Sequence, residues 1–300
     1  MIQKRCTLTK FFYGSIMKYR ISLVMIAAIA SCTTARLPVT DTFSNQATKF
    51  PVRGINGWQA NQKLQFGGYT TSEIKRGWDF TASVQYTKFR INPEEAILKV
   101  FDINTDKNTN TQKNKFQYTL ENGGLMAEIY ATEKFKEKQL VYKSNNPWIG
   151  SASKTNTYEY AFTAAIVPLT MKTNDPWSLV MINKYDRTND TARRLFDKPY
   201  VEEEGYATDG KENIAIRPLR LDHVVAENGE QTKVSGGKML SGYELHWNGE
   251  IADIIDILEN NIWILNNLDA EKKFIMASIS SAILLKRMHD IEKDKEHFDK

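Results

Sequence analysis

The sequence predicts a mainly β protein, an antiparallel sandwich or barrel, that ends in an α-helical hairpin and is therefore α+β overall. Apolar and polar residues alternate in many short segments, and turn residues separate these segments. Near the C-terminus, apolar residues recur instead at helical spacing. A chain of 300 residues with 25% charged and 41% hydrophobic residues is typical of globular proteins. This composition excludes the low-complexity, fibrous and multi-pass membrane classes.

The chain begins with a basic and then apolar segment at residues 1–31. The segment holds five basic residues and no acidic residue, and its apolar run at 21–30 ends at Ser31-Cys32. This order is typical of a secretory signal. The run is too short for a transmembrane helix, which needs about 20 apolar residues. Met1 and Met17 are both compatible with the start of this segment, because the residues after Met17 form a compact signal by themselves.

The end of this segment, Ile29-Ala30-Ser31-Cys32, is similar to the lipobox of bacterial lipoproteins. That motif has an aliphatic residue, two small residues and a cysteine, and Ile29 stands where Leu is usual. The resemblance implies that the thiol of Cys32 carries a lipid, that a peptidase cuts before it, and that a membrane is the partner of the mature chain. Two or more acyl chains give stable anchoring.

The residues after Cys32 bear on the location of this anchor. Thr33 stands where lipoproteins kept at the inner membrane usually carry Asp, so the resemblance implies the outer membrane. The acidic cluster that exports some lipoproteins to the cell surface is missing from residues 33–38. We therefore expect a protein of the bacterial cell envelope that faces the periplasm.

Removal of the signal changes the charge of the chain. The full sequence has a net charge of +4, but residues after 31 hold 35 basic and 36 acidic residues. The basic character therefore belongs to the export signal, and nucleic acid is not an expected partner. Cys32 is the one cysteine left, so no disulfide forms within the mature chain.

The mature chain divides into three expected parts. Residues 32–50 are polar without a sustained period and predict a flexible tether. Residues 51–248 predict the β-rich domain. Its clearest strands are Trp78–Tyr86 and Tyr158–Ile166, in which apolar and polar residues alternate. Weaker alternation predicts strands at Lys63–Tyr69, Ala96–Asp102, Lys115–Leu120, Leu125–Thr132, Gln139–Lys143, Ser178–Lys184, Ile214–Pro218, His223–Glu227 and Lys238–Trp247.

Turn residues and one short helix connect these strands. Glycine pairs and Asn-Gly steps predict the turns at Gly67-Gly68, Asn122-Gly123-Gly124, Asn228-Gly229 and Gly236-Gly237. Thr188–Phe196 predicts a short helix in a connection.

Residues 249–300 predict a helical hairpin packed on the β-domain. Apolar residues from Ile251 to Leu265 fall at helical spacing, after an entry at Asn248-Gly249-Glu250. Asn266-Asn267-Leu268 ends this first helix, and Asp269 caps a second one. The apolar face of the second helix includes Phe274, Ile275, Ile279, Ala282, Ile283, Met288 and Ile291.

The sequence contains no complete motif for catalysis or metal binding. The four histidines are dispersed, so no metal or cofactor is expected. The Ser-x-x-Lys pattern at Ser72–Lys75 and Ser151–Lys154 lacks the motifs that accompany it in penicillin-recognising enzymes. Glu202-Glu203-Glu204 are expected in a solvated turn. These observations favour a non-catalytic structural or binding role over an enzyme, and they name no catalytic residue.

One local feature is repeated. Asn145-Asn146-Pro147-Trp148 and Asn174-Asp175-Pro176-Trp177 share the form Asn-Asx-Pro-Trp. Trp148 and Trp177 then stand at strand starts, where they either cap the core or stack on a sugar ring. The second possibility supports an alternative function, a glycan-binding or glycan-hydrolysing envelope lipoprotein. An open groove lined by Trp or Tyr with two acidic groups would favour that alternative, and an envelope protein is the other expected partner.

Overall fold

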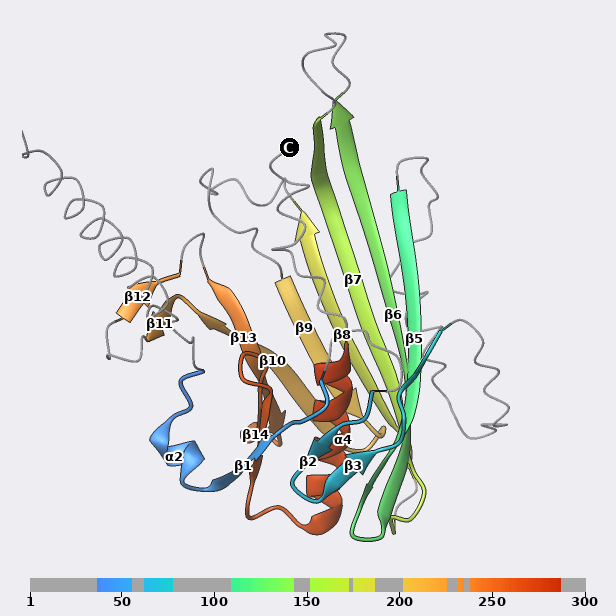
Figure 1. The fold of residues 1–300 in the computed structure, drawn as a ribbon, viewed down its shortest axis with the longest axis vertical. Helices are drawn as coiled ribbons and strands as arrows, with labels where there is room; N and C mark the ends of the chain where they lie inside the picture. The colour runs from blue at the N-terminus through green and yellow to red at the C-terminus, as the bar shows by residue number, and fades with distance from the viewer. Residues whose placement is uncertain are drawn as a thin grey trace, which may run out of the picture. The chain divides into compact units, whose positions relative to one another are not determined.

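The computed structural model describes residues 37–55, 62–77, 109–142, 152–172, 175–186, 202–225, 231–234 and 238–286. The chain forms two compact units, one of residues 37–222 with 234–300 and one of residues 1–36 with 223–233. The larger unit is mostly antiparallel β-structure with one long C-terminal helix (Figure 1). The β-rich fold class predicted from the alternating segments is therefore confirmed.

The larger unit starts with a one-turn helix, α2 (Asp41–Ser44), and ends with helix α4 (Ala270–Leu285). Between them lie its strands. These are β1 (Ala47–Pro51), β2 (Gln65–Phe66), β3 (Tyr69–Thr71), β4 (Lys75–Arg76), β5 (Thr109–Asn122), β6 (Leu125–Tyr142), β7 (Ala152–Pro168), β8 (Trp177–Asp186), β9 (Glu202–Thr208), β10 (Asn213–Leu221), β13 (Met239–Trp247), β14 (Glu250–Asp256) and β15 (Asn261–Leu265).

These strands form one barrel-like sheet that is nearly closed. Twelve of them follow each other in the order β1-β15-β14-β13-β10-β9-β8-β7-β6-β5-β3-β2, and β4 pairs with β5 beside this path. Neighbours along the path are antiparallel. Most neighbours in the sheet are also neighbours in the chain, which is the expected result of short turns between long antiparallel strands.

The two ends of the sheet meet at a narrow seam. Just past β1, Arg53 pairs with Gln65 of β2, and their backbone N–H groups donate to each other's carbonyl oxygens over 2.9 and 3.1 Å. Next to this bridge, Gly54 has φ +88°, and a Cβ there would lie 1.8 Å from the carbonyl oxygen of Lys63. The seam therefore needs glycine at position 54, both for its φ angle and for the close approach of two backbones.

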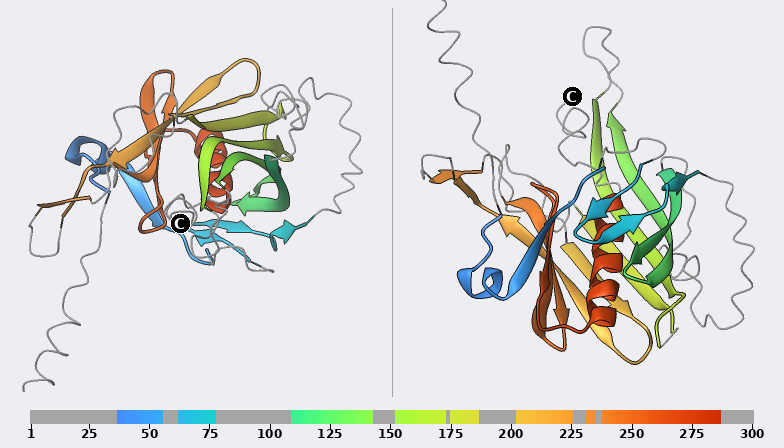
Figure 2. Two further views of the ribbon diagram at one scale, coloured as in Figure 1. Left: turned by 90° about the horizontal axis from the view of Figure 1, so that it is seen from above. Right: turned by 60° about the horizontal axis from the view of Figure 1, so that its bottom comes forward.

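Helix α4 lies within the curve of the sheet, as the view from above shows (Figure 2). The side chain of Asp269 accepts a hydrogen bond from the backbone N–H of Lys272 over 2.8 Å, which confirms the predicted cap. Every residue from Phe274 to Ile283 is buried, so the helix is covered on all of its faces. A helix with no solvated face has to be enclosed, and here the sheet encloses it.

The inward face of the sheet supplies the core around α4. Along β5 every second side chain from Phe116 to Leu120 is buried in this core, as the pleat requires, whereas β7 is buried at every position from Tyr160 to Ile166. On β5 these are Phe116, Tyr118 and Leu120, and on β7 they include Phe162 and Ile166. Together with α4 these residues form one hydrophobic core.

The predicted helical hairpin is wrong in its first half. Residues 250–256 and 261–265 are strands β14 and β15 of the sheet. Asn248 and Gly249 both have positive φ, +55° and +87°, and form the two-residue turn that joins β13 to β14. The isoleucines at helical spacing are β-branched residues, which strands favour, and the Asn-Gly step signals a hairpin rather than a helix entry.

Two other sequence expectations change. Part of the expected tether at 32–50 is structured, because α2 and β1 lie within it. The acidic run Glu202-Glu203-Glu204 is the start of strand β9 and not a turn. The turns at Gly67-Gly68 and Gly123-Gly124 lie where the sequence predicts them.

Some expectations lie outside the described residues. These are the strands Trp78–Tyr86 and Ala96–Asp102, the short helix Thr188–Phe196, the turns Asn228-Gly229 and Gly236-Gly237, and the helical residues after 286.

The smaller unit contains a two-stranded antiparallel ladder. It consists of β11 (His223–Val225) and β12 (Gln231–Lys233), with His223 opposite Lys233.

The seam yields a prediction about Gly54. The variant Gly54→Ala is expected to lose several kcal/mol of stability, because the new methyl group collides with a backbone carbonyl in addition to straining φ. Urea unfolding of the purified protein measures this loss.

Gly210 provides the matched control. It has φ +91° but open space around its Cβ position, so Gly210→Ala reports the cost of φ alone, about 1–2 kcal/mol. Equal losses of stability in Gly54→Ala and Gly210→Ala would show that the close approach of the two backbones at the seam adds nothing to the cost of the substitution.

Candidate functional site

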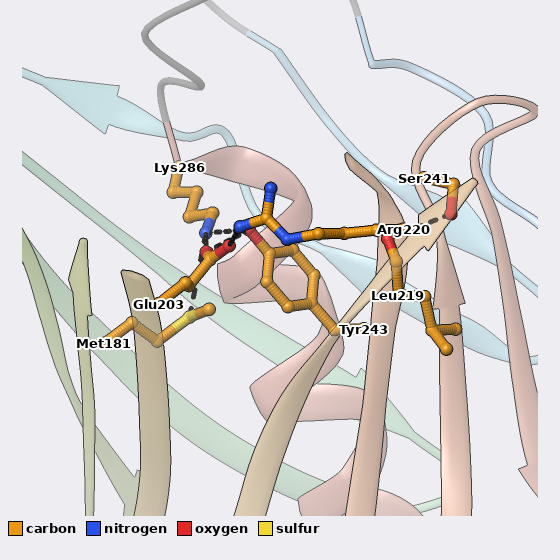
Figure 3. A network of polar contacts seen from close by, with 7 residues as sticks. All are labelled: Met181, Glu203, Leu219, Arg220, Ser241, Tyr243 and Lys286. Atoms are coloured by element: carbon orange, nitrogen blue, oxygen red, sulfur yellow. Dashed lines mark hydrogen bonds and ion pairs between the residues drawn. The ribbon is translucent and has the colours of Figure 1, made fainter. Parts of the chain in front are cut away.

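Charged side chains gather inside the barrel at the C-terminal end of α4. Charged side chains are rarely buried in an apolar interior unless they are paired. This cluster is therefore the strongest candidate for a site in the larger unit. Figure 3 shows its centre. The charged or phenolic members of the cluster are Arg76, Glu133, Glu203, Arg220, Tyr243 and Lys286.

Lys286, Glu203 and Tyr243 are in mutual contact at the centre of the cluster (Figure 3). The Lys286 Nζ lies 3.3 Å from Glu203 Oε1 and also donates to the hydroxyl of Tyr243. That hydroxyl donates in turn to Glu203 Oε1 over 2.6 Å. The ammonium group lies 4.2 Å from the centre of the Tyr243 ring, so the ring face adds a cation–π contact.

The pleat of two strands and the end of one helix bring these groups together. On β9, Glu203, Gly205 and Ala207 alternate toward the interior, and on β13 Tyr243 points the same way. Lys286 is the residue after the last turn of α4, and its backbone N–H donates to the carbonyl of Ala282 over 3.1 Å. The lysine side chain therefore leaves the helix end directly into the barrel interior.

Two arginines flank this centre. Arg220 Nη2 lies 3.7 Å from Glu203 Oε2, whereas Lys286 pairs with the other carboxylate oxygen, Oε1. The β10–β13 register shifts between Leu219 and Arg220, and Ser241 donates to the carbonyl of Leu219 over 3.0 Å (Figure 3). Arg76 Nη2 donates to the carbonyl of Leu285 over 3.4 Å. One cation thus caps the end of α4, where the backbone leaves acceptors without helical partners.

Burial sets the electrostatics of the cluster. Loss of solvent lowers the pKa of Lys286, while the nearby carboxylates of Glu203 and Glu133 act in the opposite direction. The side chains of Lys286 and Glu203 are each only 2% exposed. These atoms are thus nearly closed to solvent, and their contacts hold the end of α4 in place.

A second polar contact lies deeper, between α4 and β14. Asp253 is completely buried, and its Oδ2 accepts a hydrogen bond from the hydroxyl of Ser280 over 2.9 Å. Its other oxygen has no hydrogen-bond partner. Burial raises the pKa of Asp253 well above its ordinary value, with the Ser280 hydroxyl acting the other way. Burial therefore favours the neutral, protonated form of this carboxyl group.

Tyr118 makes a similar contact with Ser281, the next residue of the helix. Its hydroxyl lies 2.7 Å from that of Ser281, and burial raises its pKa. The Ser281 hydroxyl donates to the carbonyl of Ser278 over 2.9 Å, which leaves its oxygen free to accept from Tyr118. Polar contacts thus fix α4 at its middle as well as at its end.

The residues singled out from the sequence lie elsewhere. Cys32 and Trp148 are outside the described residues. Trp177 is the first residue of β8, is 5% exposed and packs edge-on against Trp247 with ring centres 5.5 Å apart. Trp177 therefore forms part of the core, and a shared ligand site with Trp148 stays a prediction.

Sequence reasoning missed the whole cluster. Lys286 carried a signal that could have found it, because it continues the buried face at Ile279 and Ile283 with helical spacing. Glu203 carried no such signal, because three glutamates in a row show no alternation between a buried and an exposed face.

The comparisons with known proteins add no family to this geometry. No family model, no curated protein and no solved structure matches the chain. Among the described residues, no group of three or more His, Cys, Asp or Glu side chains could hold a metal ion. None of the helices in the described ranges is long and apolar enough to cross a membrane.

The buried cluster predicts a large cost for removing one charge. Lys286→Met is expected to lower the free energy of unfolding by about 3 kcal/mol, because Glu203 then stays buried with Arg220 as its remaining cation. The double variant Lys286→Met with Glu203→Gln is expected to recover part of this loss. Denaturant unfolding measures both.

The exposed pair of Lys49 and Glu259, 3.2 Å apart, is the control for this experiment. Lys49→Met is expected to cost less than about 1 kcal/mol, because solvent screens a surface pair. A loss for Lys286→Met no larger than that of Lys49→Met contradicts the role assigned to the cluster.

The neutral state of Asp253 predicts a dependence of stability on pH. The native protein keeps a proton that the unfolded chain releases above the ordinary pKa of 3.8. The free energy of unfolding therefore falls by about 1.4 kcal/mol per pH unit between the ordinary pKa and the raised pKa of the native protein. Asp253→Asn removes this slope and is expected to raise stability at pH 7 by about 1 kcal/mol or more. Thermal unfolding between pH 4 and pH 8 tests it.

Asp256, on the same strand, is the matched control with the opposite expectation. Its carboxylate accepts from the backbone N–H groups of Leu258 and Glu259 and from the side-chain amide of Asn261. Asp256→Asn replaces one accepting oxygen by a donor and is expected to lose about 1 kcal/mol. If Asp253→Asn destabilises as much as this control at pH 7, the buried carboxyl is not neutral.

Proposed function

We propose that this chain is a lipid-anchored protein of the bacterial cell envelope with a non-catalytic structural or binding role. The observation that carries the proposal is the lipobox-like sequence Ile29-Ala30-Ser31-Cys32 at the end of a basic and apolar segment. A lipid on Cys32 would place the β-domain at a membrane surface, and Thr33 favours the outer membrane with the domain facing the periplasm.

The arrangement inside the barrel supports a role that does not use its interior. Helix α4 fills the space within the curve of the sheet, and its polar groups are bonded to the surrounding strands. Barrels that hold a small ligand keep this space open for it. A binding role would therefore use the outer surface of the barrel, which the proposed anchor leaves exposed to the envelope.

One observation favours the glycan-binding alternative as a form of this binding role. The outer surface carries an open pocket lined by a tyrosine and two glutamates, Tyr130, Glu73 and Glu128. Carboxylates and aromatic rings are common partners of sugar hydroxyls and sugar ring faces. The pocket supports binding of a glycan without supplying a pair of carboxylates at a measured catalytic separation.

The anchor is tested by substitution of the cysteine. Cys32→Ala, expressed in a bacterium fed a labelled palmitate analogue, is expected to lose the label and to leave the membrane fraction, because the thiol that accepts the lipid is removed. The wild-type protein is expected to carry the label and to sediment with membranes.

Cys6 provides the control, since it precedes the signal's apolar run. Cys6→Ala is expected to keep both the label and the membrane fraction. If Cys32→Ala stays with the membranes, the proposal of a lipid anchor fails.

A further inference from the structure

The pocket on the outer surface lies where strand β5 changes partners. It has a volume of about 140 Å³ and opens to solvent. β5 pairs with β3 at Thr70 and Thr71 and with β4 at Lys75 and Arg76. Residues 72–74 between these two strands leave the ladder, and this departure makes the hollow.

Hydrogen bonds hold the rim of the hollow in place. The backbone N–H of Ser72 donates to the carbonyl of Thr119 over 2.8 Å, and the N–H of Thr119 donates to the Ser72 hydroxyl oxygen over 3.0 Å. A few residues further on, the N–H of Ile74 donates to the carbonyl of Gln62 over 2.9 Å. The segment is therefore fixed at both ends, and the pocket is preformed.

The register of β5 and β6 sets the lining. Gln117 is opposite Tyr130, and Thr119 is opposite Glu128, all on the outward positions of their strands. Opposite residues of an antiparallel pair have Cβ atoms about 5 Å apart, so these four side chains make a continuous surface. Ser72, Glu73 and Lys75 line the pocket from the adjoining segment, and Tyr118 of β5 completes the lining.

The polar groups of this lining are already oriented. The hydroxyl of Tyr130 donates to Glu128 Oε2 over 2.7 Å, which fixes the carboxylate beside the ring. Glu73 lies at the opposite rim, with its carboxylate 4.0 Å from Lys63 Nζ. Gln117 contributes both a donor and an acceptor, and Thr119 a hydroxyl group.

The chemistry and the size of the pocket select a class of ligand. Two carboxylates against one lysine in the lining disfavour phosphate and other anions. Amide, hydroxyl and carboxylate groups beside an aromatic ring match the alternating hydroxyls and C–H faces of a sugar. The volume is well below the roughly 300–1,000 Å³ of pockets for drug-sized ligands, so a single ring is accommodated.

We propose that this outer pocket binds one uncharged sugar unit, a hexose or an N-acetylhexosamine, of a cell-envelope glycan. The inference rests on the proposed binding role and is independent of the lipid on Cys32. Glu128 and Gln117 bind the hydroxyl groups of the sugar, and Tyr130 contacts its ring. The chain beyond this unit stays in solvent, because the pocket is open.

Calorimetric titration of the detergent-solubilised full chain with chitotriose and with maltotriose tests the proposal. At least one of the two sugars is expected to bind. Tyr130→Ala and Glu128→Gln are each expected to weaken its affinity at least ten-fold, about 1.4 kcal/mol. Glu128→Gln keeps an oxygen that accepts from the Tyr130 hydroxyl, so this variant changes the charge while it retains the local hydrogen bond.

Tyr206 on β9 is the matched control, because it is an exposed tyrosine, 46% accessible, that does not line the pocket. Tyr206→Ala is expected to leave the affinity unchanged. Thermal unfolding of all variants shows that each is folded, and Tyr130→Leu, which removes the ring but keeps an apolar side chain, replaces Tyr130→Ala if the latter does not fold.

Each outcome of the titration bears on the proposal. No binding of either sugar at concentrations up to about 10 mM overturns it, and so does binding that Tyr130 and Glu128 variants leave unchanged. Binding of phosphate in place of sugar also overturns it. A wild-type protein that takes up no palmitate label but still binds the sugar would refute the lipid anchor and leave the sugar site standing. The two proposals can therefore be refuted independently.

Discussion

Helix α4 is buried around its whole circumference from Phe274 to Ile283, and the rest of the larger unit depends on this constraint. Such a helix gains its stability only when every face is removed from water, which one face of an open sheet cannot provide. The sheet therefore curves until its first and last strands meet beside Gly54. The serines of α4 fit this enclosure because their hydroxyls bond to the helix backbone, to Asp253 or to Tyr118.

Enclosure also explains why charges lie inside the barrel. The last carbonyls of a helix have no helical partners, and an end that lies in the interior has to find donors there. Arg76 supplies one of these donors at Leu285. Lys286 brings a second cation to the same place, and Glu203 with Tyr243 compensates it. The cluster is thus a consequence of enclosing the helix end, while the outer pocket is built by the partner change of β5.

The sequence predicts the parts of this fold in which the local signal and the tertiary structure agree. Apolar and polar residues alternate clearly in β7 and more weakly in β5, β6 and β8, and Asp269 caps its helix through a purely local bond. The prediction fails at β14 and β15, where apolar residues stand on both faces and a period of two cannot be seen in the sequence. The cluster could not be predicted either, because the partners of Glu203 come from strands and a helix that are distant in the chain.

The pairing of β1 with β15 sets the order in which this molecule can mature. Thr48 and Asn266, whose side chains are hydrogen-bonded across the pair, are 218 residues apart. Contacts of such high sequence separation form late, since a long loop must close before they gain energy. α4 follows β15 directly, so the first strand and the enclosed helix both wait for residues 261–285. A chain that emerges from its N-terminus therefore cannot complete this barrel until α4 has been synthesised.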